Sequence, residues 1–78
     1  MNNYEPGDII EIMQLYQNSD TLYWELIKSI QGLLIEEIDN DLLCVLVNGK
    51  KEVHDIGYTP YLKFKVEVIS EGNENGKG

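Results

Sequence analysis

The sequence contains no alanine and no arginine, and it has one cysteine and two prolines among 78 residues. Alanine is the best helix former, and arginine supplies the planar, two-pronged donor that phosphate recognition favours. One cysteine excludes a disulfide within the chain. The longest apolar run, from Leu42 to Val47, has six residues, whereas a membrane-spanning helix needs about 20. We therefore expect a soluble, intracellular protein.

Negative charge dominates the sequence. Acidic side chains outnumber lysines by 14 to 6, which gives a formal net charge of −8. Residues 1–49 hold nine of these acids and a single base, Lys28, so they carry all of the net charge. A surface of this sign repels the phosphate backbone on which nucleic-acid binding depends. The charge predicts no nucleic-acid partner and favours proteins with basic surfaces. The short apolar runs predict no membrane partner.

The length predicts one domain over residues 8–69, with a lead-in at 1–7 and a flexible tail at 70–78. The tail contains three glycines and no apolar residue, which is typical of an unpacked terminus. A chain of this size buries only about 60% of its surface on folding, which leaves room for one small core but not for an enclosed substrate groove. We therefore expect no enzymatic activity and no cofactor.

Alternation of apolar and polar residues predicts five strands. They are expected at Asp8 to Leu15, Leu33 to Ile38, Leu42 to Val47, Lys50 to His54 and Phe64 to Val68. Asn48-Gly49 is the strongest short signal for a two-residue type I′ turn, because both central residues must tolerate positive φ. This turn predicts three cross-strand pairs: Val47 with Lys50, Cys44 with Val53, and Leu43 with His54.

The segment from Thr21 to Gln31 fits two structures. Helical spacing joins Leu22, Tyr23, Leu26, Ile27 and Ile30, with Asp20 placed to cap the N-terminus and Gly32 to end the helix. Alternation instead joins Leu22, Trp24, Leu26, Lys28 and Ile30, as in one leg of a long β-hairpin. We favour a short helix or helical turn at residues 21–31.

Apolar residues occupy both faces of the central hairpin if Ile38 pairs with Leu42. One face then carries Leu34, Ile38, Leu42, Cys44, Leu46 and Val53. The other carries Leu33, Ile35, Leu43, Val45 and Val47, beside Glu37, Lys50, Glu52 and His54. One small core buries only one of these faces. The second must be covered by the segment from Leu22 to Ile30 or by another protein chain.

The sequence offers one candidate nucleophile and one acidic cluster. Cys44, His54 and Asp55 are the only set from which an activated thiolate could be built, but the predicted register sends Cys44 and His54 to opposite faces of the sheet. The carboxylates of Glu36, Glu37, Asp39 and Asp41 lie within six residues. Their spacing lacks the glycine and the final glutamate of a calcium-binding loop. We expect neither a catalytic dyad nor a metal site.

Short strands joined by tight turns favour a small barrel, and four segments carry a resemblance to a known family: Gly7 to Ile10, Gly32 to Ile38, Val45 to Lys50 and Val66 to Glu71. Over residues 7–71 the chain resembles the small SH3-like β-barrel proteins that are widespread in tailed bacteriophages. The resemblance implies a mainly β fold, a small five-stranded SH3-like barrel. It also implies a virus-encoded accessory domain that is located in the host cytoplasm or in the virion.

These observations lead to the hypothesis of a non-enzymatic accessory protein that works by protein–protein contact. The expected partner is a phage structural protein or a host factor, and a homo-oligomer is an alternative. The predicted contact residues are Leu43, Val45, Val47, Tyr23, Trp24, Tyr58 and Tyr61. The alternative function is an acidic inhibitor or nucleic-acid mimic that occupies a basic groove of a host enzyme through Glu36, Glu37, Asp39 and Asp41.

Overall fold

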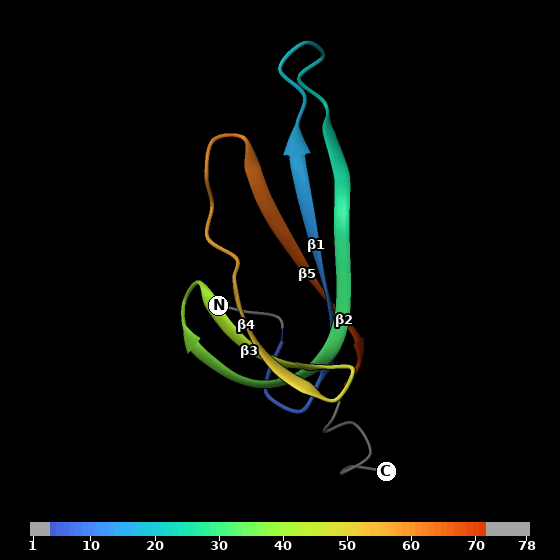
Figure 1. The fold of residues 1–78 in the computed structure, drawn as a ribbon, viewed down its shortest axis with the longest axis vertical. Helices are drawn as coiled ribbons and strands as arrows, with labels where there is room; N and C mark the ends of the chain where they lie inside the picture. Colours follow the sequence, from blue (N-terminus) through green and yellow to red (C-terminus); the bar gives the residue numbers. More distant parts are fainter. Residues whose placement is uncertain (1–3, 72–78) are drawn as a thin grey trace.

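The computed structural model describes residues 4–71. Its strands are β1 (Ile9–Gln17), β2 (Trp24–Asp39), β3 (Leu42–Val47), β4 (Lys50–Asp55) and β5 (Leu62–Ser70). They form one antiparallel five-stranded sheet in the order β4-β3-β2-β1-β5 (Figure 1). The predicted mainly β fold is confirmed. Most of the predicted tail, residues 72–78, lies outside the described residues.

The sheet is not closed into a barrel, so the prediction of a closed SH3-like barrel is wrong. Among residues 4–71, β4 and β5 form the two free edges and do not pair with each other. The side chains on the concave face explain why. This face carries Gln14 on β1, Lys28 on β2, and Glu52 and His54 on the edge strand β4. Polar groups of this kind are costly to bury without partners, so the edges stay apart.

The predicted helix at residues 21–31 is also wrong, because Trp24–Gln31 forms the first half of β2 and pairs with β1. The pairing is interrupted by a bulge at Ile27, where Gln14 pairs with Lys28 and Leu15 with Leu26. A bulge reverses the side-chain alternation of a strand. The described residues contain no helix long and apolar enough to cross a lipid bilayer.

The core occupies one face of the sheet, which we call the inner face. Its five buried apolar residues come from three strands: Ile10 and Ile12 from β1, Leu34 from β2, and Leu43 and Val45 from β3. Tyr4, Phe64, Val66 and Val68 are among the partly buried side chains that pack against this cluster. The turn before β1 is attached to the same region, because the Gly7 amide donates to the Leu34 carbonyl at 2.8 Å. The buried Asp8 carboxylate accepts from the Glu5 amide at 2.9 Å.

The strand β2 curves and carries β3 and β4 across the end of the sheet (Figure 1), and Gly32 lies next to the residue at which its pairing changes from β1 to β3. A Cβ atom at this position would lie 2.5 Å from the Leu46 carbonyl oxygen and 2.6 Å from Val45 Cγ1. Both distances are far below van der Waals contact, and one of them involves backbone. Only glycine therefore permits β3 to lie this close to β2.

The turn between β3 and β4 matches the sequence prediction. Asn48 and Gly49 have φ values of 52° and 83°, the left-handed region that a type I′ turn requires at both positions. The three predicted pairs, Val47 with Lys50, Cys44 with Val53 and Leu43 with His54, are all present. The turn alone is thus enough to fix the register of this hairpin.

The register between β2 and β3 differs from the prediction, because bulges shift it between Leu34 and Glu36 and again between Glu37 and Asp39. Leu34 therefore pairs with Val45 and joins the core, and Asp39 pairs with Leu42 in place of Ile38. The face predicted to unite Leu34, Ile38, Leu42, Cys44, Leu46 and Val53 does not form as one surface.

The opposite, outer face of β3 and β4 is not covered by the segment from Leu22 to Ile30. That part of the chain lies in the loop and strand that pair with β1, and its own Leu26 and Ile27 are more than half exposed. On the outer face Cys44 and Leu46 are half-buried, whereas Val53 is 59% exposed. Cover by another protein chain stays a prediction.

Replacing Gly32 with alanine should lower the free energy of unfolding by about 1–3 kcal/mol, because the added methyl group overpacks the contact with β3. The matched control is Gln31→Ala, at an exposed position of the same strand, which should change stability by less than about 0.5 kcal/mol. Urea unfolding followed by tryptophan fluorescence measures both values. Equal stability of the two variants would contradict a contact that requires glycine.

Candidate functional site

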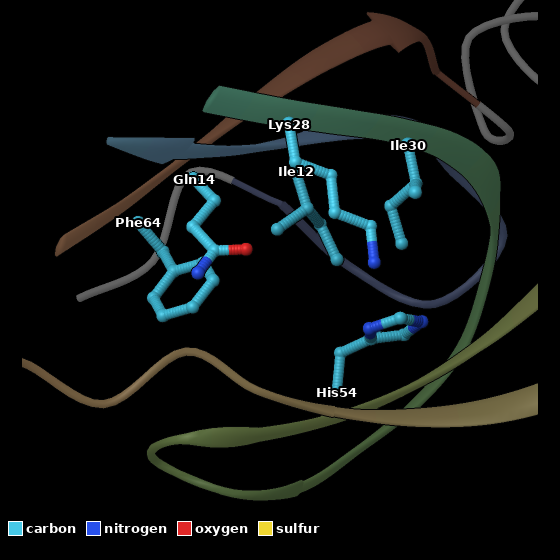
Figure 2. Close-up of a pocket in the computed structure, with 6 residues that line it drawn as sticks. All are labelled: Ile12, Gln14, Lys28, Ile30, His54 and Phe64. Atoms are coloured by element: carbon cyan, nitrogen blue, oxygen red, sulfur yellow. The ribbon is translucent and has the colours of Figure 1, made fainter. Parts of the chain in front are cut away.

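A small cavity opens on the inner face in the gap between the free edges of the sheet. It has a volume of about 40 Å³ and is lined from four strands: Ile12 and Gln14 on β1, Lys28 and Ile30 on β2, His54 on β4, and Phe64 on β5 (Figure 2). We call it the inner cavity. Its walls are mostly apolar, and its polar groups converge from opposite sides.

The side chains of Lys28 and His54 point toward each other across the inner cavity (Figure 2). His54 Nε2 lies 2.8 Å from Glu52 Oε1, two residues away on β4, so it donates to this carboxylate. Within residues 4–71, Lys28 has no carboxylate within 4.0 Å. The cavity thus places one unpaired ammonium group opposite a partnered imidazole.

The candidate nucleophile and the histidine do not come together in the structure. Cys44 lies on the outer face opposite Val53, whereas His54 lies on the inner face opposite Leu43, as the register predicted. Residues 4–71 contain no group of three or more histidine, cysteine, aspartate or glutamate side chains placed to hold a metal ion.

Exposed apolar side chains gather where β1 ends, β2 begins and the connection to β5 finishes. The Gln17 amide donates to the Tyr61 carbonyl at 3.0 Å, which holds the two loops at the same end of the molecule. The exposed fractions are 44% for Tyr16, 66% for Leu22, 74% for Tyr23 and 62% for Tyr61. We call these four residues the apolar end.

The loop of the apolar end is fixed by hydrogen bonds. Asn18 Oδ1 accepts from the amides of Asp20 and Thr21 at 2.8 and 3.1 Å. The Asn18 carbonyl accepts from the Leu22 amide at 2.7 Å, and the Leu22 carbonyl accepts from Gln17 Nε2 at 3.0 Å. These bonds hold Leu22 at a φ of 66°, a conformation that costs non-glycine residues about 1–2 kcal/mol.

A shallow groove lies beside the apolar end on the outer face of the sheet. Its apolar floor consists of Met13, Leu15, Trp24 and Leu26, and Lys63 and Lys65 flank it from β5. The Lys63 ammonium lies 4.4 Å from the centroid of the Trp24 ring, within the range of a cation–π interaction. Trp24 and Leu26 reach this face, and Lys28 reaches the inner cavity, because the bulge at Ile27 lies between them.

The predicted contact residues fall into three environments. Tyr23, Tyr58 and Tyr61 are strongly exposed, and Trp24 is half-buried in the outer groove. Leu43 and Val45 have no exposed surface and belong to the core, whereas Val47 is half-buried at its edge. The sequence did not single out Leu22 as an exposed residue or Lys28 as a cavity residue. The turn-forming residues Asn18 to Thr21 were the signal that could have placed Leu22 at the surface.

The acidic cluster lies at the turn between β2 and β3, far along the chain from the apolar end. Glu36, Asp39 and Asp41 are exposed there, and Glu37 is half-buried on the inner face. Burial, followed by the negative charges of Glu37 and Asp41, raises the pKa of Tyr4 above its usual value of 10.0. The negative charges of the acidic cluster therefore affect Tyr4, a side chain that packs against the core.

No protein-family model, curated protein or solved structure matches this chain.

The pKa of Tyr4 is raised in the folded protein, so the folded state holds the phenol proton more tightly than the unfolded state. The free energy of unfolding must then fall as the pH rises from about 10 through the folded-state pKa. Tyr4→Phe should remove this part of the alkaline loss. Unfolding in urea at pH values from about 8 to about 11 measures it. The control Tyr58→Phe, at a 75% exposed tyrosine, should keep the full loss, and identical pH profiles for both variants would contradict the assignment.

Proposed function

We propose that this chain is a non-enzymatic protein that acts through protein–protein contact, with the apolar end as its principal contact surface. The observation that carries the proposal is Leu22, which is 66% exposed and held at a φ of 66°. A strained backbone that places a leucine in water weakens folding, and strain of this kind clusters at binding sites.

The chemistry of the apolar end fits a contact surface. Tyrosine combines a large apolar ring with a hydroxyl group and loses little conformational entropy when it is buried. The bonds from Asn18 and Gln17 already order the loop in the free protein. A preformed surface pays less ordering entropy on association, so more of its contact energy appears as affinity.

The apolar end also lies away from the part of the sheet that stabilises the fold. The core residues of β2 and β3 lie where these two strands pair, whereas the apolar end lies at the far end of the β1–β2 hairpin (Figure 1). The longest dimension of the molecule is 48 Å. A long hairpin that exposes its apolar tip contributes little to the core, and this favours a role in binding.

The biological setting of the proposal follows from the resemblance over residues 7–71 to small SH3-like proteins of tailed bacteriophages. It supports a phage structural protein or a host factor as the partner, in the host cytoplasm or in the virion. This support comes only from the strand and turn segments of the sequence. The open sheet does not add to it, since a barrel of that family would be closed.

A second candidate function, an acidic inhibitor or nucleic-acid mimic, is favoured by one observation. Glu36, Asp39 and Asp41 are exposed, and none of them forms an ion pair with another described residue. Such carboxylates remain available to a basic groove. Contact through exposed charges weakens strongly as salt rises, because the screening length falls from about 10 Å at 0.1 M to about 3 Å at 1 M.

Replacing Leu22 with glycine should separate binding from stability. Glycine relieves the strain at positive φ, so Leu22→Gly should be more stable than Leu22→Ala by about 1 kcal/mol. Both variants lose the leucine side chain. They should therefore bind a partner protein, once one is isolated by affinity capture, at least about tenfold more weakly. Thermal unfolding and surface plasmon resonance measure the two effects. Wild-type affinity in both variants would refute the contact role of Leu22.

The partner itself is sought by affinity capture from host lysate, alongside mass spectrometry of purified virions. We expect the captured protein to stay bound at about 1 M salt, to be lost with Tyr23→Ser, and to be kept with Asp39→Asn combined with Asp41→Asn. The reverse pattern, with release by salt and by the double asparagine variant only, would establish the acidic mimic in place of the apolar contact.

A further inference from the structure

We propose that the free edge of β5 pairs with β5 of a second copy of this chain, so that two chains form a dimer with one continuous antiparallel sheet. Among residues 4–71, β1 is the only strand that pairs with β5. A strand edge without a neighbour presents a row of backbone donors and acceptors to another strand. The pairing uses no residue of the apolar end, so it does not depend on the role proposed for that surface.

The backbone groups that face the free edge follow from two hydrogen bonds at the start of β5. The Tyr61 carbonyl accepts from the Gln17 amide of β1 at 3.0 Å, and the next carbonyl, that of Leu62, accepts from the Thr59 amide at 3.0 Å. Successive residues of a strand direct their backbone groups to opposite sides, and the register with β1 is unbroken from Leu62 as far as Val68. The amides and carbonyls that point away from β1 are therefore those of Phe64, Val66 and Val68.

The charges of β5 select one register for two copies. In a two-fold symmetric antiparallel pair centred on Val66, Lys65 of each chain lies opposite Glu67 of the other. Centring the pair on Lys65 would place the two copies of this lysine opposite each other, and centring it on Glu67 would do the same for the glutamates. Like charges directly opposite each other are destabilising. The two neighbouring registers are thus disfavoured.

The same register matches the apolar side chains of the inner face. Phe64 lies opposite Val68 of the second copy, and Val66 lies opposite its own equivalent. These are also the residues whose backbone groups face the free edge, so each can exchange hydrogen bonds with the residue opposite. The pairing stops before Leu62, because Thr59 already bridges to it. A contact this short predicts a weak dimer, with a Kd of about 0.01–1 mM.

The lysines of this edge do not prevent the pairing. Lysine on an edge strand resists pairing with most other chains, but here an acidic residue lies two positions away. The Lys65 ammonium lies 3.2 Å from Glu67 Oε2 of the same strand, and the two side chains are 61% and 52% exposed. Both groups therefore remain accessible to a second copy. The other free edge, β4, is shorter, with six residues against nine, and its Glu52 is already bonded to His54.

The dimer would carry two copies of the apolar end. Tyr61 directly precedes β5, and antiparallel pairing directs the starts of the two strands to opposite ends of the contact. A partner with repeated binding sites could then be held at two points, which raises the apparent affinity without any new kind of contact. This consequence rests on the role proposed for the apolar end, whereas dimerisation itself does not.

Charge reversal tests the pairing and its register together. Lys65→Glu brings acids of the two chains opposite each other, and Glu67→Lys brings bases opposite each other. Each variant alone should dimerise at least about tenfold more weakly than the wild type. An equimolar mixture of the two variants restores every opposite-charge pair and should form a mixed dimer about as tightly as the wild type does. Analytical ultracentrifugation of the full chain, from about 10 μM to about 1 mM, distinguishes one 8.9-kDa chain from two.

The matched control is Lys51→Glu, which makes the same change of charge at an exposed position of the other free edge. It should change dimerisation less than about twofold, and circular dichroism checks that every variant is folded. Three results would each overturn the proposal: a wild type that is monomeric at about 1 mM, a mixture that stays monomeric while the wild type dimerises, or equal losses in Lys51→Glu and Lys65→Glu.

Discussion

The close approach of β3 to Gly32 is the contact on which the rest of the structure depends. The Leu46 carbonyl and the Val45 side chain occupy the space that any Cβ atom at residue 32 would need. This contact lets a 16-residue strand belong to two parts of the sheet, because β2 pairs with β1 as far as Leu33 and with β3 from Leu33 onward. The curvature of β2 places Leu43 and Val45 among the same buried residues as Ile10 and Ile12. A straight β2 would separate these two groups of side chains.

The inner face beyond this core is polar, and its polarity determines the final shape. Moving Gln14, Lys28, Glu52 and His54 into a closed barrel would require a partner for each polar group. The chain supplies one such pair, His54 with Glu52, and leaves the Lys28 ammonium facing a small cavity. The edges that remain free carry lysines, at Lys50 and Lys51 on β4 and at Lys63 and Lys65 on β5. Charged edge strands resist pairing with other chains, so an open sheet is tolerated.

Short sequence motifs predicted those parts of the fold that depend on residues close together in the chain. Asn48-Gly49 specified its turn, and the turn specified every pair between β3 and β4. The register between β2 and β3 could not be predicted in the same way, since its two bulges leave no mark in the alternation of apolar and polar residues. Residues 21–31 were compatible with helix and strand, and the decision came from pairing with β1, a contact between distant parts of the chain.

The candidate sites were predictable to different degrees for the same reason. Exposed tyrosines at predicted loops were recognisable, because loop residues lie at the surface in nearly any fold. The sequence pattern around Leu43 and Val45 is compatible with a contact surface and with a core. Their complete burial in the structure assigns both residues to the core. The inner cavity needs Lys28 and His54 on facing strands, and the bulge at Ile27 is what turns Lys28 inward. The same bulge sends Trp24 and Leu26 to the outer face. One extra residue in β2 thus places Lys28 and Ile30 at the inner cavity and Trp24 and Leu26 at the outer groove, so the two surfaces share no side chain of β2.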